Sequence, residues 1–277
     1  MRLHQSRREG LALKKPLLLL LLISMLEKGE LRENRVRFSS IEARLKELIL
    51  EFGGRRARHG PKPEQPFSHL DEKLWHILPL AREGRRETLP VSVLRDPGVY
   101  AEFPEWVYDV LCTPSGRARV AEFLLASFWP PDTVANDIRS ALGIGQPVVV
   151  VRRDPAFVVA VLENYRYRCA FCGFDALLNR LPYGLDAGHI RWFSQQGPDS
   201  LDNGLALCKL HHWALDRGVM TVQADSGRIQ VSRSFQARDP VSIGLIEQLD
   251  GKSLAEPRDC RPAGAHLTWQ GENVFLG

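Results

Sequence analysis

The sequence predicts an α+β protein with two domains, a mostly helical one over residues 10–150 and a mixed one over residues 155–277. Two observations carry this prediction. Apolar residues recur with helical spacing through much of the first half. In the second half, cysteines and a histidine follow the order C-x2-C, a gap of 35 residues, then C-x2-H. At 277 residues, each domain is large enough to bury its own core.

Helical periodicity defines most of the first domain. Its second helix is expected to begin at Ser39-Ser40, because serine is a good N-cap residue. Two short apolar-aromatic stretches, residues 66–70 and 74–77, predict a strand. The helical patterns lie at residues 11–29, 40–52, 103–112, 116–128 and 132–142.

The run from Pro16 to Met25 is strongly apolar, but it is about ten residues long and a bilayer needs roughly 20. We therefore expect a buried helix and no membrane association. A signal peptide is the alternative, because Arg7, Arg8 and Lys14 precede the run, but no small-residue cleavage site follows it. The odd number of cysteines, five, argues against a disulfide framework and favours the cytoplasm.

Basic residues are in excess in the first half. Residues 1–154 hold 25 Lys and Arg against 20 Asp and Glu, and the rest of the chain holds 12 against 13. This excess fits a polyanionic partner but also an ordinary basic enzyme. The densest stretch lies among glycines and prolines, and predicts an exposed basic loop or, as the alternative, a solvated run of charges. It contains Arg55, Arg56, Arg58, His59 and Lys62.

The second domain opens with a helical pattern over residues 156–165, and a last one covers residues 266–275. Zinc prefers thiolate and imidazole ligands in a tetrahedron, and C-x2-C lets a tight turn aim two thiolates at one ion. The segment between the half-sites is rich in polar residues, glycine and proline, so bound metal would supply folding free energy to residues 165–215. A redox dithiol is the alternative. The pattern predicts structural Zn²⁺ on Cys169, Cys172, Cys208 and His211.

Three further polar residues are not needed to hold zinc. His211 and His212 are adjacent, so on a helix their side chains point about 100° apart and His212 faces elsewhere. His189 is expected on a strand and Asn203 in a turn. Any one of these residues alone would more commonly have a surface or capping role. The three together, set among the predicted zinc ligands, indicate a functional site.

The order and spacing of His189, Asn203 and His212 resemble the HNH nuclease motif, a ββα-metal fold, in the variety that has an accessory CxxC…CxxH zinc site. The resemblance covers roughly residues 160–232. It implies that His189 is the general base, that Asn203 holds a loop and orients His189, and that His212 binds a catalytic Mg²⁺ or Mn²⁺.

The chain departs from many HNH sequences at the residue before the first histidine. That position is commonly an acidic metal ligand, but here it is Gly188, and the nearest acid is Asp186. On an extended strand Asp186 points to the face opposite His189. We therefore expect Asp186 to be either a second ligand of the catalytic ion or a structural residue.

Apolar and proline-rich pieces of the first domain resemble the sulfur-binding domain of McrA-type, phosphorothioate-dependent restriction endonucleases. With the HNH motif, the resemblance spans nearly the whole chain. It implies phosphorothioated double-stranded DNA as the partner. A nuclease with one active site per chain often cuts both strands as a dimer, so we also expect a homodimer. The pieces lie at residues 15–20, 66–70, 74–75, 128–131, 137–138 and 143–144.

Sulfur in place of a phosphate oxygen is larger, softer and less well hydrated, so an apolar pocket should prefer it. The resemblance implies a pocket with a polar side and a basic loop that neutralises neighbouring phosphates. The alternative for the pocket is that Trp129 and Pro130 only start a helix and pack in the core. The implied residues are Trp129, Pro130 and Thr133 for the pocket, Ser68 and His69 for its polar side, and Arg55, Arg56, Arg58 and Lys62 for the phosphates.

The expected function is therefore a type IV-like, modification-dependent restriction endonuclease. Two alternatives stay open from the sequence. One is an HNH nuclease that reads methylated or unmodified DNA. The other is a zinc DNA-binding regulator in which His189 and His212 have no catalytic task.

Overall fold

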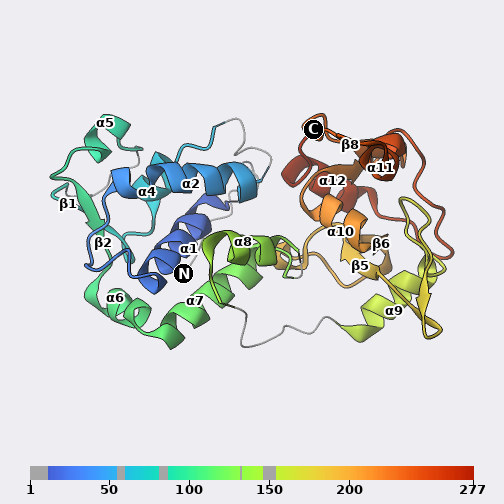
Figure 1. The fold of residues 1–277 in the computed structure, drawn as a ribbon, viewed down its shortest axis with the longest axis horizontal. Coiled ribbons are helices and arrows are strands. Elements are labelled where there is room, and N and C mark those ends of the chain that lie inside the picture. Colours follow the sequence, from blue (N-terminus) through green and yellow to red (C-terminus); the bar gives the residue numbers. More distant parts are fainter. Residues whose placement is uncertain (1–11, 55–59, 81–86, 132, 146–153) are drawn as a thin grey trace. The chain divides into compact units, whose positions relative to one another are not determined.

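The chain forms two compact units, each with its own core (Figure 1). Unit 1 comprises residues 1–128 and 135–148, and unit 2 comprises residues 129–134 and 149–277. The computed structural model describes residues 12–54, 60–80, 87–131, 133–145 and 154–277.

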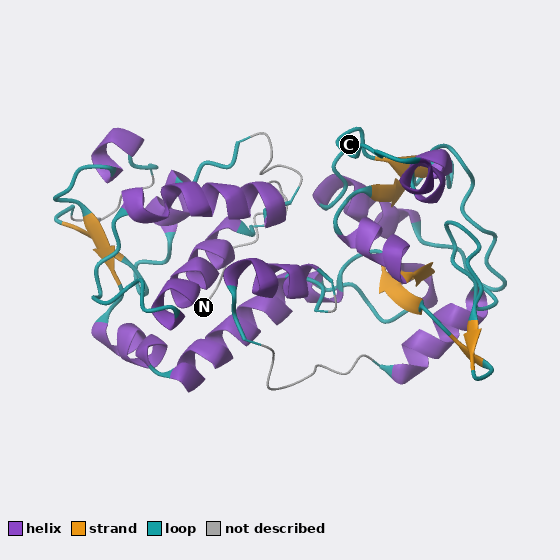
Figure 2. Ribbon diagram, in the orientation of Figure 1, coloured by secondary structure: helices purple, strands orange, loops and turns teal. Residues whose placement is uncertain are grey.

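The described part of unit 1 is mostly helical, as predicted, with a two-stranded antiparallel sheet (Figure 2). In this sheet Ile77 pairs with Ala101. Its helices are α1 (Lys14–Glu27), α2 (Phe38–Phe52), α4 (Glu64–His69), α5 (Val91–Leu94), α6 (Glu105–Cys112), α7 (Pro114–Phe128) and α8 (Val134–Leu142), and its strands are β1 (His76–Leu78) and β2 (Tyr100–Glu102).

Helix α1 is the buried centre of unit 1. Every residue from Pro16 to Met25 is buried, and the helix contacts α2, α4, α6 and α7. A helix that is apolar all round must be covered on all sides, so the leucine run forms a core helix. Along the described part of the chain, no helix is both long and apolar enough to cross a membrane.

Four aromatic side chains form the second part of this core. Phe38, Phe67, Trp75 and Phe103 pack edge to face in a row, with ring centroids 5.0–5.5 Å apart. The indole Nε1 of Trp75 donates to the carbonyl of Phe67 at 3.0 Å, so the buried ring leaves no polar atom without a partner.

Two expectations for unit 1 were wrong in detail. Residues 64–69 are a short helix and not a strand, because a proline at the start of a helix loses no hydrogen bond and Pro66 lies within the first turn. Helix α2 starts earlier than expected, after Arg37, so Ser39 and Ser40 lie inside its first turn. Ser40 Oγ donates to the carbonyl of Arg37 instead of capping the helix.

Unit 2 is built from short helices and two-residue to five-residue strands. Its helices are α9 (Pro155–Asn164), α10 (Lys209–Asp216), α11 (Pro240–Leu245) and α12 (Gly264–Asn273), with 3-10 turns η1 (Phe193–Gln195), η2 (Leu201–Asn203) and η3 (Glu247–Leu249). Its strands are β3 (Leu177–Leu178), β4 (Leu181–Pro182), β5 (Leu185–His189), β6 (Gly204–Cys208), β7 (Met220–Val222) and β8 (Ile229–Val231).

Strands β5 and β6 and helix α10 form a ββα unit. The strands pair antiparallel, from Leu185 with Cys208 to His189 with Gly204, and α10 contacts both. The expectation that the segment between the zinc half-sites lacks apolar residues was wrong for these strands, because Ala187 and the run Leu205–Leu207 are buried in the core of unit 2.

Candidate functional site

Three cysteines and one histidine converge at one end of the ββα unit. Their ligand atoms all lie within 4.8 Å of one another, a spacing that can hold one metal ion. Cys169 and Cys172 come from the turn after α9, which closes with a hydrogen bond from Gly173 N to Cys169 O (2.8 Å) and a left-handed Gly173. Cys208 ends β6 and His211 lies in the first turn of α10. Thiolate and imidazole donors in this number suit tetrahedral zinc.

The His211 ring is held in the orientation that metal binding requires. Its Nδ1 lies 3.1 Å from Cys208 Sγ and 3.4 Å from Cys169 Sγ, while Nε2 donates to the carbonyl of Leu245 on α11 (2.8 Å). Burial lowers the pKa of His211, but hydrogen bonds with the Cys169 and Cys208 sulfurs and with that carbonyl raise it to about 10. The Leu245 carbonyl accepts from Nε2 and so leaves Nδ1 facing the sulfurs, where it would bind a metal ion.

His212, one residue further along α10, lies between two carboxylates. Its Nδ1 is 3.0 Å from Asp186 Oδ2, and its Nε2 is 3.4 Å from Asp216 Oδ2, one helical turn away. Both His212 and Asp216 are buried. The adjacent histidines His211 and His212 thus serve different clusters. Gly188 makes room for this arrangement, because a Cβ there would lie 2.9 Å from His212 Cδ2.

Asp186 lies on the α10 side of strand β5. Burial raises the pKa of Asp186, but hydrogen bonds from His212 and from Lys209 Nζ (2.7 Å) lower it to about 2, so the carboxylate is charged at neutral pH. An ionised carboxylate beside an imidazole is the donor chemistry that Mg²⁺ and Mn²⁺ accept. The structure therefore places the Asp186 carboxylate and the His212 imidazole in one cluster.

His189 ends strand β5 and is buried with 7% of its surface exposed. Its ring stacks on Phe157 of α9, with centroids 4.3 Å apart and planes at 17°. Its Nε2 lies 2.6 Å from Asp199 Oδ1. Helix α9 can come this close because Gly204 has no side chain, since a Cβ there would lie 2.3 Å from Val161 Cγ2.

Asn203 is fully buried and closes the loop between β5 and β6. Its Oδ1 accepts from Arg191 N (2.8 Å), and its Nδ2 donates to the carbonyls of Arg191 (3.1 Å) and Pro198 (2.9 Å). The side chain thus binds loop backbone at both ends of the loop.

The polar side of the predicted sulfur pocket is engaged with a neighbouring segment of unit 1. Ser68 Oγ accepts from Leu89 N (3.2 Å), and His69 Nε2 lies 2.8 Å from Thr88 Oγ1. In the predicted basic loop, Lys62 is exposed and adopts a left-handed φ of 40°. The predicted phosphate-binding residues Arg55, Arg56 and Arg58 lie outside the described residues.

The predicted pocket residues Trp129, Pro130 and Thr133 are buried and belong to unit 2. Thr133 Oγ1 donates to Asp216 Oδ2 at 2.5 Å, so this hydroxyl contacts the carboxylate that also faces His212. Their role in sulfur recognition stays a prediction.

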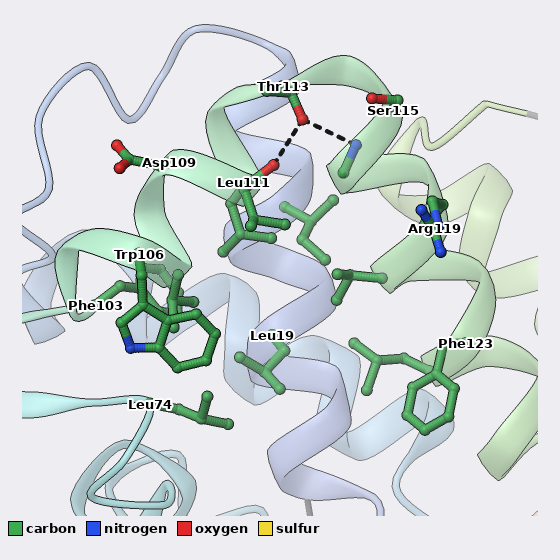
Figure 3. Close-up of a pocket in the computed structure, with 16 residues that line it drawn as sticks. Leu19, Leu74, Phe103, Trp106, Asp109, Leu111, Thr113, Ser115, Arg119 and Phe123 are labelled. Carbon is green, nitrogen blue, oxygen red and sulfur yellow. Dashed lines mark hydrogen bonds between the residues drawn. The ribbon is translucent and has the colours of Figure 1, made fainter.

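A separate apolar cavity of about 810 Å³ lies between α6 and α7, over α1 (Figure 3). Trp106 and Phe123, both largely exposed, flank it, and Thr113 and Arg119 are on its rim. It does not coincide with the predicted sulfur pocket, because its lining includes none of Ser68, His69, Trp129, Pro130 and Thr133.

Sequence reasoning missed three residues of the site. Asp216 could have been found, because it lies four residues after His212 on the same helix and so on the same face. Asp199 and Phe157 had no such signal. They are 10 and 32 residues from His189, and only the folded loop and the packing of α9 bring them to its ring.

Two family models match the chain. The model of the ScoMcrA-like, DNA sulfur-binding domain matches residues 1–146, and the model of the HNH endonuclease matches residues 169–223. No curated protein matches the chain. Among the similar solved structures is a "Modification dependent TagI restriction endonuclease", at 21% identity and a TM-score of 0.35. That alignment covers 49% of this chain and 44% of that one, so the chain spans less than half of that protein.

Proposed function

We propose that this chain, which belongs to the ScoMcrA-like family of DNA sulfur-binding domain proteins, binds phosphorothioated double-stranded DNA. In this proposal it hydrolyses phosphodiester bonds near the modified site. The observation that supports this most is the order of domains in one chain. A DNA sulfur-binding domain over residues 1–146 is followed by an HNH endonuclease domain over residues 169–223. The first would select the DNA and the second would cut it, as a modification-dependent restriction endonuclease does.

The proposed reading step depends on the difference between sulfur and oxygen. A phosphorothioate keeps the backbone charge but replaces one well-hydrated oxygen with a soft, poorly hydrated sulfur. In the proposal, Trp129 and Pro130 would supply apolar walls and Thr133 a hydroxyl beside them, and Ser68 and His69 of unit 1 would supply further polar contacts to the DNA. The basic loop that includes Lys62 would add sequence-independent attraction to neighbouring phosphates.

The proposed chemical step uses His189 as the general base. A water O–H bond breaks as its proton moves to a ring nitrogen of His189, and the water oxygen forms a bond to phosphorus. The P–O3′ bond breaks opposite the attacking oxygen, and the 3′-oxygen leaves with the bonding electrons and takes a proton from solvent. The stack of His189 on Phe157 supports this role, because a fixed ring needs no reorientation before proton transfer.

The residues that would hold the catalytic divalent ion are His212 and Asp186, with Asp216 as a further carboxylate. The charged oxygen of Asp186 and the imidazole of His212 fit Mg²⁺ or Mn²⁺, whereas the three sulfurs of the other cluster fit Zn²⁺. A divalent ion there would stabilise negative charge that develops on the phosphate and on the leaving oxygen. Structural zinc would fix the end of β6 and the start of α10, and so the position of His212.

Phosphorothioated and plain plasmid, incubated with the protein and with Mg²⁺, Mn²⁺ or EDTA, test the proposal. We expect cleavage of the modified plasmid in the presence of a divalent ion, and none in EDTA. Equal cleavage of both plasmids would instead favour a nuclease that does not read sulfur, and no cleavage of either would favour a DNA-binding regulator. Because one site per chain must cut two strands, we also expect a homodimer on DNA by sedimentation.

A further inference from the structure

We propose that Asp199 is the positioning residue for His189, and that Asn203 acts on His189 through Asp199 and not by direct contact. This inference rests on the proposed function, because it assigns the source of orientation for the proposed general base. It does not require any particular DNA target.

The first support is the contact between the two side chains. Asp199 Oδ1 lies 2.6 Å from His189 Nε2, a short distance typical of a hydrogen bond to a charged acceptor. The ring is held on its face by Phe157, and Phe193 lies 6.0 Å from its centroid. In the proposal Nε2 carries the proton and donates to the carboxylate, so Nδ1 would be the nitrogen that takes the proton from water. Asp199 would also stabilise the imidazolium that forms.

The second support is the way the loop places Asp199. Asn203 Nδ2 donates to the carbonyl of Pro198, the residue directly before Asp199. The other two hydrogen bonds of the Asn203 side chain join the backbone of Arg191, two residues after His189. Asn203 therefore ties the segment that carries the carboxylate to the strand end that carries the imidazole, while its three side-chain hydrogen bonds all go to backbone.

The third support is the close packing of this loop at Gly197. A Cβ there would lie 1.8 Å from Arg191 O and 2.9 Å from Asn203 Nδ2. Any side chain at this position would push the loop away from Asn203. The close approach of Gly197 to Arg191 and Asn203 therefore also sets the position of Asp199, two residues later. Together these contacts describe a loop built to hold one carboxylate against one ring.

The variant that tests the proposal is Asp199→Asn, with Asp202→Asn as the matched control. Asp202 lies three residues away, carries the same charge, and accepts a hydrogen bond from Ser200. We expect Asp199→Asn to lower the single-turnover cleavage rate by about 10²–10⁴-fold, with little change in the dissociation constant for DNA. The control should cleave at a rate near that of the wild type. A wild-type rate for Asp199→Asn would overturn the proposal.

A spectroscopic readout separates this inference from the proposed function. Nitrogen-15 NMR of the imidazole rings, with His189→Gln used to assign the His189 signals, reports which ring nitrogen carries the proton. We expect the Nε2–H form in the wild type and a larger share of Nδ1–H in Asp199→Asn. If the wild type does not cleave DNA but the ring proton still shifts from Nε2 toward Nδ1 in Asp199→Asn, the proposed function fails and the positioning contact stands. Nδ1–H as the main neutral form in the wild type would overturn the positioning role.

Gly197→Ala provides a second route to the same site. If Gly197 and Asn203 act through Asp199, the double variant Gly197→Ala/Asp199→Asn should cleave no more slowly than the slower single variant. Multiplying losses would mean that the loop affects His189 by another path, and would contradict the relay through Asp199. A circular dichroism melt of each variant identifies any that does not fold. If Gly197→Ala does not fold, the comparison of Asp199→Asn with Asp202→Asn decides alone.

Discussion

Replacing His189 with alanine is expected to lower the single-turnover rate of cleavage of phosphorothioated DNA by about 10²–10⁴-fold, which corresponds to roughly 3–5 kcal/mol of transition-state stabilisation. The reason is that the ring is the proposed acceptor of the proton from water and is already fixed by Phe157 and Asp199. Binding of the same DNA should be nearly unchanged, because the proposed reading residues lie elsewhere in the chain.

The matched control is His266→Ala, which removes another imidazole from unit 2, on helix α12. It should cleave at nearly the wild-type rate. His189→Gln keeps a polar side chain of similar size, so it separates the loss of the base from the loss of packing against Phe157. If His189→Ala and His189→Gln both cleave modified DNA as fast as the wild type, His189 is not the general base.

With zinc on the cluster of Cys169, Cys172, Cys208 and His211, as proposed, its removal by chelation is expected to unfold most of residues 165–215. Structural zinc contributes about 10–16 kcal/mol in zinc-finger peptides, while a whole domain is stable by about 5–15 kcal/mol. The cluster joins the turn of Cys169 to the start of α10, and His211 Nε2 also ties α10 to Leu245. Its loss therefore releases three segments at once. Cys208→Ser should reproduce the effect of chelation, and near-ultraviolet circular dichroism with metal analysis measures it.

Cys260→Ser is the control for this experiment, since it makes the same substitution in unit 2 outside the cluster. It should keep both the zinc content and the spectrum. Purified protein without zinc whose spectrum does not change in EDTA would contradict the prediction.

The sequence predicted the parts of this molecule that depend on local spacing. Helical periodicity located α1 and α2, and the α+β class with a sulfur-binding domain before an HNH domain is confirmed by the two family matches. The spacing of Cys169 and Cys172 predicted a cluster that the structure brings within reach of one ion. Adjacent histidines on a helix diverge by geometry alone, so the separation of His211 from His212 also followed.

The parts that could not be predicted depend on contacts between distant segments. Nothing in the spacing of Asp199 marks it as the partner of His189, because the contact exists only once Asn203 and Gly197 close the loop. Likewise, the carbonyl of Leu245 reaches His211 from a helix 34 residues away. The wrong prediction of a strand at residues 66–70 arose because an apolar-aromatic pattern of five residues fits a buried helix equally well.

The most direct test of the central claim compares two duplexes that are identical except for one stereodefined phosphorothioate linkage. Binding to each is measured with the His189→Ala protein, and cleavage of each with the wild type and a divalent ion. We expect tighter binding to the modified duplex and cleavage of that duplex alone, both weakened by added salt. Equal affinity and equal cleavage for the two duplexes would contradict it.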